Sequence, residues 1–398
     1  MNDWNQVSMI VFCLRILLIT VFLTILNFQF VIAFQVSGQP AESVEYRFDL
    51  RPVYSFVNST ERDGAQHTDH SINLRGRFGI SYHIRSDLTF RGRAAMRLSS
   101  NQSDFRFLLD DHTGGGGSYP AGTATFDELL LSWQVSPELK LTAGRFQGRF
   151  PLAGFIPKGV DRYYGANLSI SHTDGLWLEW DVSERWRLNL IGSHNSPSGS
   201  SHAARFPLRF DESGAARFTG FANIQHRNTH DRWAQRELSI SVTPQNFYRD
   251  GELRDHVSIS GRWMYRAGFT FAGEEYLLGG EVGYIPVAPR PSDFGLQIHE
   301  DRLPLERSAV AWQFSAYINN FFMHHRIGIL YGQTDPHWLI SSSFANNVTM
   351  AEMRYRYTIA SWINYEFRFR LRDEIYRPTG ANQTRQIVDF HTRFTVSF

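Results

Sequence analysis

The sequence predicts an all-β protein: a transmembrane antiparallel β-barrel of about 16 strands, with short turns at one end and long loops at the other. Three observations lead to this fold class. Apolar and polar residues alternate with a period of two through most of the chain after residue 43, and the connections between these segments are short and long in turn. The last segment, Ile387 to Phe398, alternates to its final aromatic residue. Because side chains alternate across a strand, each segment has one apolar and one polar face.

The composition agrees with a barrel and excludes several other classes. The 398 residues carry a net charge of +1, so no polyelectrolyte partner such as nucleic acid is indicated. Aromatic residues make up 15% of the chain and accompany 31 glycines, which suits a barrel with aromatic girdles. Only Lys140 and Lys158 are lysines, so nearly all 40 basic residues are arginine. The single cysteine, Cys13, lies in the predicted leader, which leaves the mature chain without thiols.

The N-terminus has the features of a secretory signal peptide. Arg15 precedes an apolar run, and small residues near Ala33 suit signal peptidase. We therefore expect a signal peptide at 1–33, a short segment at 34–42 and an outer-membrane barrel at 43–398. The alternative is a retained transmembrane anchor, although polar residues near the end of the run argue against it. A start at Met9 would give a more usual leader.

The alternation can be followed through the chain. In the first segment Val44 and Tyr46 alternate with Glu45 and Arg47. The predicted strands are centred on 44–51, 72–84, 88–98, 124–135, 139–143, 164–182, 186–190, 218–224, 238–242, 257–265, 276–284, 310–318, 327–331, 353–357, 363–371 and 387–398. We treat 164–182 as one strand with a break at Thr173-Asp174-Gly175, because dividing it would give an odd number and disturb the alternation of loops.

The connections divide into two classes. Eight are longer and rich in Gly, Ser and Asp: 58–70, 100–123, 147–163, 195–214, 244–252, 286–306, 333–347 and 373–383. Short periplasmic turns and long extracellular loops are typical of outer-membrane barrels. A soluble β-sandwich would also alternate. It would not explain the aromatic residues near strand ends, which suit a membrane interface.

The polar faces of the first three and last three strands are rich in arginine. Closure of a barrel places the last strand beside the first, so these six strands would form one inner wall. The arginines of this wall are Arg47, Arg51, Arg75, Arg77, Arg91, Arg93, Arg97, Arg354, Arg356, Arg368, Arg370, Arg372 and Arg393. Against these thirteen arginines, alternation places five carboxylates on the same wall, Glu45, Asp49, Glu352, Glu366 and Asp389.

An excess of about eight arginines has two interpretations. Arginine stays protonated and is weakly hydrated, so a water-filled tube with such a wall would favour anions. Alternatively, the arginines pair with neighbouring carboxylates and make the wall rigid.

The third long loop, 147–163, is the candidate constriction. Its charged residues are Arg149, Lys158, Asp161 and Arg162. Its apolar residues, including Phe150 and Phe155, have little use on an exposed loop. We therefore expect the loop to fold against the inner wall.

The strand TAGRF ending at Phe146, the loop after it and the terminal Phe398 resemble the sixteen-stranded bacterial porins, both general-diffusion and phosphate-selective. The resemblance implies a barrel in the cell outer membrane of a Gram-negative bacterium, narrowed by its third loop. It also implies outer-membrane lipid as the surroundings, small hydrophilic or anionic solutes as cargo and a homotrimeric assembly. The near absence of lysine argues against phosphate as the solute, because phosphate-selective porins are rich in pore lysines.

Other kinds of site find little support in the sequence. Fifteen histidines show no metal-ligand spacing, and no nucleophile is placed with a base. We therefore expect no metal, no cofactor and no enzymatic activity. The favoured function is a moderately anion-favouring channel for passive diffusion. The alternatives are a substrate-specific channel for organic anions or acidic sugars, and a loop-based receptor or outer-membrane enzyme.

Overall fold

The structure is a computed structural model that describes most of the chain after residue 42. The described residues are 43–102, 104–109, 121–148, 150, 152, 154–156, 159–160, 173–195, 217–227, 232–249, 252–268, 274–290, 298, 308–338, 340–341 and 344–398. The expected signal peptide 1–33 and segment 34–42 lie outside them, as do residues 164–172 of the expected strand 164–182.

In the described part of the chain, seventeen strands form a single sheet. They are β1 (Val44–Thr60), β2 (Gln66–Arg85), β3 (Leu88–Ser99), β4 (Arg106–Phe107), β5 (Thr123–Gln134), β6 (Leu139–Phe146), β7 (Thr173–Asp181), β8 (Trp186–Asn195), β9 (Arg217–Arg227), β10 (Trp233–Arg249), β11 (Glu252–Arg266), β12 (Glu275–Ile285), β13 (Ala309–Phe321), β14 (His325–Thr334), β15 (Val348–Ala360), β16 (Ile363–Glu374) and β17 (Gln386–Ser397). In the part of the chain that the structure covers, no helix is both long and apolar enough to cross a membrane.

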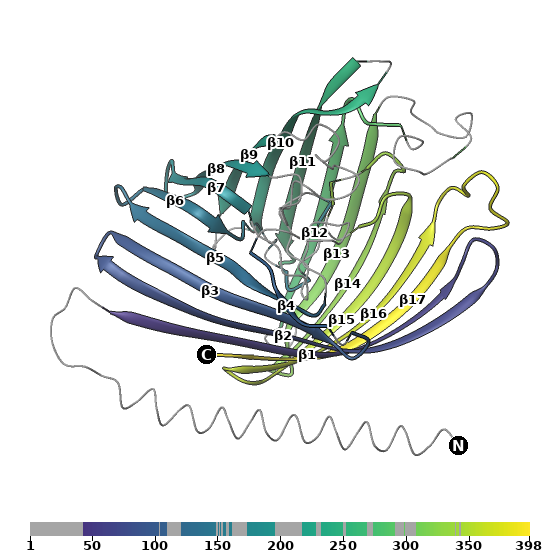
Figure 1. The fold of residues 1–398 in the computed structure, drawn as a ribbon, viewed down its shortest axis with the longest axis horizontal. Helices are drawn as coiled ribbons and strands as arrows, with labels where there is room; N and C mark the ends of the chain where they lie inside the picture. Colours follow the sequence, from purple (N-terminus) through teal and green to yellow (C-terminus); the bar gives the residue numbers. More distant parts are fainter. Residues whose placement is uncertain are drawn as a thin grey trace. The chain divides into compact units, whose positions relative to one another are not determined.

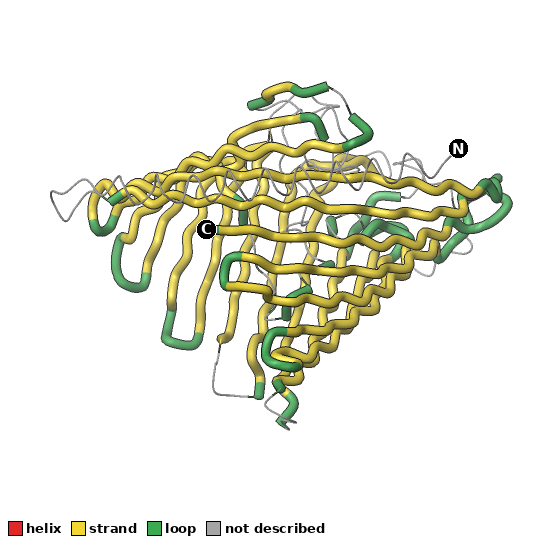
Figure 2. Tube along the Cα trace, turned by 90° about the horizontal axis from the view of Figure 1, so that it is seen from below, coloured by secondary structure: helices red, strands yellow, loops and turns green. Residues whose placement is uncertain are grey.

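The sheet closes on itself. The strand β1 pairs antiparallel with β2 on one side and with β17 on the other, from Asp49↔Ser397 to Thr60↔Gln386. The two-residue β4 adds only a short parallel pairing to β5, so the other sixteen strands form the antiparallel barrel (Figures 1 and 2). Phe398 completes the seam, because its N–H donates to the Phe48 carbonyl at 3.0 Å and its carbonyl accepts from the Phe48 N–H at 3.1 Å.

The two faces of the barrel differ as the alternation predicts. On β14, Ile329 is 56% exposed on the outer face while Leu330 is 3% exposed on the inner face. On β13, Phe314 is exposed and its neighbour Gln313 is buried. The outer face is therefore apolar and the inner face holds the polar side chains. This confirms the predicted fold class, a closed all-β antiparallel barrel with sixteen strands.

Three expected boundaries are wrong in detail. The strands β1 and β2 stay paired up to Thr60↔Gln66, so most of the expected loop 58–70 is strand. The strands β10 and β11 likewise extend to Arg249↔Glu252, with a register shift after Thr243 that includes the proline Pro244. The Thr-Asp-Gly triplet, which was expected as a break, forms the start of β7, and residues 164–172 before it lie outside the described part of the chain. Polar strand ends of this kind pair through backbone hydrogen bonds and resemble loops only in composition.

A clasp of loop residues holds the closing strands together beyond the seam. We define the clasp as Glu61 and Arg62, after β1, with Glu374 and Arg385, at the two ends of the β16–β17 loop. Arg62 Nε donates to Glu374 Oε1 at 3.1 Å, and Arg385 Nη2 lies 2.9 Å from Glu61 Oε1. The hydrogen bond to Glu374 raises the pKa of Arg62.

The charge of the clasp depends on pH through Glu61. Slight burial opposes ionisation of Glu61, but the hydrogen bond from Ser59 and the charge of Arg385 outweigh it and lower its pKa. The contribution of this carboxylate is therefore present at neutral pH and is lost as the pH falls through its lowered pKa.

The variant Glu374→Gln should weaken the clasp. Glu374 accepts from the Arg62 side chain and from the Arg385 N–H, so its neutral replacement loses charge-assisted hydrogen bonds. We expect a loss of about 1 kcal/mol in the free energy of unfolding, measured by urea titration in lipid vesicles. Asp373→Asn next to it is the control, and equal losses for the two variants would contradict the clasp.

The variant Ile329→Arg should report the orientation of the strands. An arginine at a lipid-facing position near the middle of a bilayer costs about 2–4 kcal/mol. The same urea titration should show this loss, while Ile329→Leu should change the free energy of unfolding little. A wild-type value for Ile329→Arg would mean that this face does not meet lipid.

Candidate functional site

The candidate site is the inner wall formed by β15, β16, β17, β1, β2 and β3. The thirteen arginines predicted for this wall lie on these six strands, on the face opposite the exposed apolar side chains. Several are almost completely buried, among them Arg75 and Arg354 at 0% exposure. Burial of a guanidinium group requires a partner, so the pairing of each arginine decides the charge of the wall.

The β1–β3 half of the wall contains two groups of ion pairs. Asp49 accepts from Arg51 Nε at 2.9 Å and from Arg75 Nη2 at 2.6 Å. Asp127, on β5, lies 2.7 Å from the Nε atoms of both Arg77 and Arg93. The Arg77–Arg93 pair is therefore close to neutralised, since Glu128 Oε1 also lies 2.7 Å from Arg93 Nη2.

Asp127 and Glu128 lie on β5, next to the six wall strands, so they were not among the five carboxylates predicted for the wall. A β-bulge in addition turns Asp127 inward. The register between β3 and β5 shifts between Arg93↔Glu128 and Ala94↔Phe126, which leaves Asp127 as an extra residue. A bulge lets two consecutive side chains face the same way, whereas strict alternation assigns Asp127 to the outside. With these two carboxylates of β5 added to the five on the wall strands, thirteen arginines are accompanied by seven carboxylates, an excess of six, where the six strands alone give eight.

The carboxylate of Glu366, on β16, is shared by arginines of β15 and β17. It lies 3.2 Å from Arg354 Nη1, 2.9 Å from Arg356 Nη2 and 2.7 Å from Arg393 Nη2. Arg354 is also 2.5 Å from Glu352. Three arginines and two carboxylates thus form a compact group that leaves one positive charge.

Three arginines of β16 pair with a single carboxylate, which belongs to β17. Asp389 lies 2.6 Å from Arg368 Nη2, 2.8 Å from Arg370 Nε and 3.0 Å from Arg372 Nη2. These side chains keep 14–24% of their surface exposed. We call Arg368, Arg370, Arg372 and Asp389 the β16 cluster.

The remaining wall arginines differ from one another. Arg47 pairs loosely with Glu45, at 3.6 Å, near the short-turn end. Arg91 and Arg97 have no hydrogen bond or ion pair to any residue that the structure describes, and their Nε atoms are buried. The uncompensated charge is thus concentrated at the β16 cluster and at Arg91 and Arg97 on β3.

The described residues of the third loop contact the inner face of the barrel. Its four charged residues, Arg149, Lys158, Asp161 and Arg162, lie outside the described residues. Near the start of the loop, the ring of Phe150 lies 5.1 Å from that of Phe221 on β9 and 5.6 Å from that of Trp177 on β7. The loop thus packs first against the inner face of β7 and β9.

Further along, the third loop reaches the opposite side of the barrel. The Phe155 ring lies 5.6 Å from Tyr317 on β13 and 5.3 Å from the Arg356 guanidinium on β15. The Arg356 Nη2 also donates to the Phe155 carbonyl at 3.4 Å. Gly328 on β14 makes room for the loop, because a Cβ there would press on Phe155 and Ile156. A wall arginine therefore holds the tip of the third loop.

A second loop holds the end of the third loop. The Val160 N–H donates to Glu281 Oε2 at 2.9 Å, and its carbonyl accepts from Trp338 Nε1 at 3.0 Å. Ser341 Oγ donates to the Gly159 carbonyl at 2.8 Å. Trp338 and Ser341 belong to the loop between β14 and β15, which was expected only as a long connection over 333–347. Its apolar residues, Trp338, Ile340 and Phe344, were the signal that it turns inward.

The rest of the inner wall carries mostly neutral polar groups. Asn189 donates to Asn223 at 3.2 Å, and Asn223 donates to Glu237 at 3.2 Å. Arg262 Nε in turn donates to Glu237 at 2.6 Å. Lys140 and Arg145 are likewise paired, with Glu179 and Asp174. Among the described residues, the arginine excess therefore lies on the β15–β3 side of the barrel.

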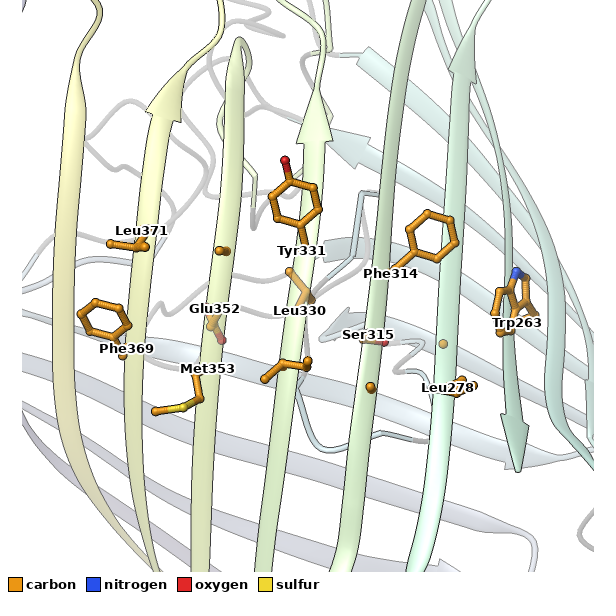
Figure 3. A pocket seen from close by; sticks show the side chains of 14 residues that line it. Trp263, Leu278, Phe314, Ser315, Leu330, Tyr331, Glu352, Met353, Phe369 and Leu371 are labelled. Carbon is orange, nitrogen blue, oxygen red and sulfur yellow. The ribbon is translucent and has the colours of Figure 1, made fainter. Parts of the chain in front are cut away.

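A shallow hollow on the outer face belongs to a different environment. It has a volume of about 540 Å³ and is lined by outward side chains of β11 to β16, including Phe314, Tyr331 and Phe369 (Figure 3). Its apolar lining assigns it to the lipid-facing surface. Among the residues that the structure covers, no group of three His, Cys, Asp or Glu side chains is placed to hold a metal ion.

A closed sixteen-stranded antiparallel barrel with an apolar outer face, a polar inner face and an in-folded loop is the fold of bacterial outer-membrane porins, and this chain has that fold. The structure of Pseudomonas putida OprB at high pH is similar, with a TM-score of 0.59, 12% identity, and coverage of 89% of this chain and 94% of that one. Salmonella typhi OmpF, in complex with daunomycin, gives a TM-score of 0.57 at 12% identity, covering 90% and 98% of the two chains. No family model and no curated protein sequence matches the chain.

The variant Trp338→Phe should loosen the third loop. It keeps the aromatic packing and removes the Nε1–H bond to the Val160 carbonyl, a buried acceptor. We expect a loss of about 1 kcal/mol in the free energy of unfolding. Trp362→Phe, at an exposed rim position stacked on Phe398, is the matched control and should change it less. Equal changes would show that the Val160 contact does not stabilise the barrel.

Proposed function

We propose that this protein is an outer-membrane porin that forms a water-filled, moderately anion-favouring channel for passive diffusion of small hydrophilic solutes. The observation that carries the proposal is the balance of charge on the β15–β3 wall. Its thirteen arginines are accompanied by seven carboxylates, two of which belong to the adjacent strand β5. Guanidinium groups stay protonated at any physiological pH. The wall therefore keeps its positive excess under all relevant conditions and raises the local concentration of anions.

The constriction in this proposal is the third loop. Its anchors at Phe150, Phe155 and Val160 lie on different parts of the inner face, which supports a path across the lumen. Arg149, Lys158, Asp161 and Arg162 would then add to the charge that a solute meets at the narrowest point. The channel carries out no chemistry, so the proposal includes no catalytic residue and no cofactor.

The remaining features of the proposal concern export and assembly. The segment 1–33 would be removed as a signal peptide during export to the outer membrane of a Gram-negative cell. The apolar outer face would meet outer-membrane lipid, and three copies would form a homotrimer. The porin-like architecture and the sequence of the N-terminal segment support these features of the proposal.

A second candidate is a substrate-specific channel for organic anions or acidic sugars. The β16 cluster favours it, because three arginines around one carboxylate form a local site in addition to a diffuse field. The two candidates differ in whether one class of anionic solute is transported in preference to other small hydrophilic solutes.

The test of the proposal is the reversal potential of the purified protein in a planar bilayer under a tenfold KCl gradient. Ideal selectivity for one ion would give about 59 mV. We expect an intermediate value with the sign of chloride preference, since the wall excess is partly screened by salt. A cation-selective reversal potential, or a barrel that does not conduct, would overturn the proposal.

The double variant Arg91→Gln, Arg97→Gln should reduce this anion preference. These two arginines have no partner among the described side chains, so their removal lowers the wall excess from six to four without freeing a carboxylate. The reversal potential should move toward zero. The control is Arg85→Gln, Arg185→Gln, which removes two arginines from the short turns. An equal shift in the control would attribute the selectivity to the net charge of the protein instead of the wall.

A further inference from the structure

We infer that the β16 cluster is a saturable binding subsite for an oxyanion, positioned before the constriction on the long-loop side of the barrel. The inference rests on the proposed channel function and adds a discrete site to the diffuse field of the wall. It names the class of ligand as a carboxylate or phosphate group and assigns its recognition to Arg368, Arg370 and Arg372.

The cluster has donors that its own carboxylate does not use. Each arginine has five N–H groups, and each contributes one hydrogen bond to Asp389. The Nε atoms of Arg368 and Arg372 are buried and have no acceptor among the described residues. The guanidinium groups nevertheless keep part of their surface open to the lumen. A second acceptor group in the lumen could therefore reach them.

Strand geometry explains why the three arginines converge. Residues i, i+2 and i+4 of a strand point to the same face, about 6.8 Å apart. Arg370 lies directly opposite Asp389 in the β16–β17 register, so the carboxylate can reach Arg368 and Arg372 on either side. Asp389 therefore gathers the three guanidinium groups while neutralising only one of their charges.

The cluster is less compensated than the other groups of this wall. Asp127 and Glu128 balance Arg77 and Arg93. The Glu352 and Glu366 carboxylates leave one charge on their three arginines. The β16 cluster leaves two charges within one hydrogen-bonded unit. A bound monoanion would lower this excess and accept charge-assisted hydrogen bonds.

The position of the cluster suits a site on the path of a solute. The strand β16 runs from the short turn at Ile363 toward Glu374 and the long loop after it. Arg368 lies opposite Arg354, two residues along β15 from Arg356, which holds the tip of the third loop. Arg370 and Arg372 continue from there toward the long-loop end. A solute entering from that end meets the cluster before the constriction.

Oxyanions suit this cluster better than chloride does. A guanidinium group presents parallel N–H donors that match two oxygens of a carboxylate or phosphate. Chloride has one centre, so it cannot present a separate acceptor atom to each N–H of the fork. Chloride therefore reports the field of the wall, while acetate and inorganic phosphate report the subsite.

The experiment measures inhibition of chloride current by added acetate or inorganic phosphate in planar bilayers. The variant Arg368→Gln, Arg372→Gln is compared with Arg91→Gln, Arg97→Gln, which removes the same charge from the same wall. For the wild type we expect saturable inhibition by at least one of the two oxyanions. The β16 variant should need at least roughly tenfold more oxyanion for half inhibition, the equivalent of one lost charge-assisted hydrogen bond. The β3 variant should stay within about twofold of the wild type.

Each result has one meaning. A larger effect of phosphate would identify a tetrahedral dianion as the better ligand, and a larger effect of acetate would identify a carboxylate. If oxyanion inhibition were weakened equally in the two double variants, the subsite would be overturned and the diffuse field of the wall would explain the inhibition. The subsite would also be overturned if neither oxyanion inhibited the chloride current of the wild type. A barrel without anion preference in KCl alone would instead overturn the proposed function, so the two failures are distinguishable.

The single variant Arg372→Lys tests the subsite independently, in case the double variant does not fold. It keeps the charge and removes the fork, so the KCl reversal potential should stay near the wild-type value. Half inhibition by the oxyanion should require several-fold more ligand, because a lysine binds as a point charge. Unchanged inhibition in this variant would contradict recognition by the guanidinium fork.

Discussion

The closure of the sheet between β1 and β17 is the constraint on which the rest of the structure depends. Hydrocarbon offers no hydrogen-bond partner, so a sheet can cross a membrane only when no edge is left open. The pairing from Asp49↔Ser397 to Thr60↔Gln386 removes both edges, and Phe398 extends it by pairing with Phe48. Closure also divides the side chains into an outer and an inner set, because alternate residues point to opposite faces. The arginine wall exists only because closure places β15–β17 beside β1–β3.

Closure also gathers the charged side chains on the inner face of the barrel. Thirteen guanidinium groups on six adjacent strands would repel one another strongly if unpaired, and the fold compensates seven of them with carboxylates on the same face. The compensation is uneven: Asp127 and Glu128 balance their partners, whereas Asp389 gathers three arginines. Both interpretations of the arginine wall thus hold in part, since most arginines are paired and a positive excess of six still remains.

Much of this architecture could be predicted from the sequence because the period of two is a direct consequence of strand geometry. The sixteen strands, the apolar outer face at Phe314 and Ile329 and the six-stranded wall all follow from it. The errors occur where a local feature overrides the period. A bulge turned Asp127 inward, and hairpins of polar composition stayed paired as far as Thr60 and Arg249. The inward turn at Trp338 depends on contacts with Val160, far away in the sequence, which no local pattern contains.

The central claim, that one face of the strands meets lipid and the other meets water, is tested most directly by thiol accessibility. The sole cysteine is Cys13, so in a Cys13→Ser background single cysteines can be introduced at Arg370 on the inner face and at Ile329 on the outer face. In membrane-embedded protein, a water-soluble, membrane-impermeant thiol reagent should label Arg370→Cys and leave Ile329→Cys unlabelled. Labelling of Ile329→Cys with protection of Arg370→Cys would contradict the account.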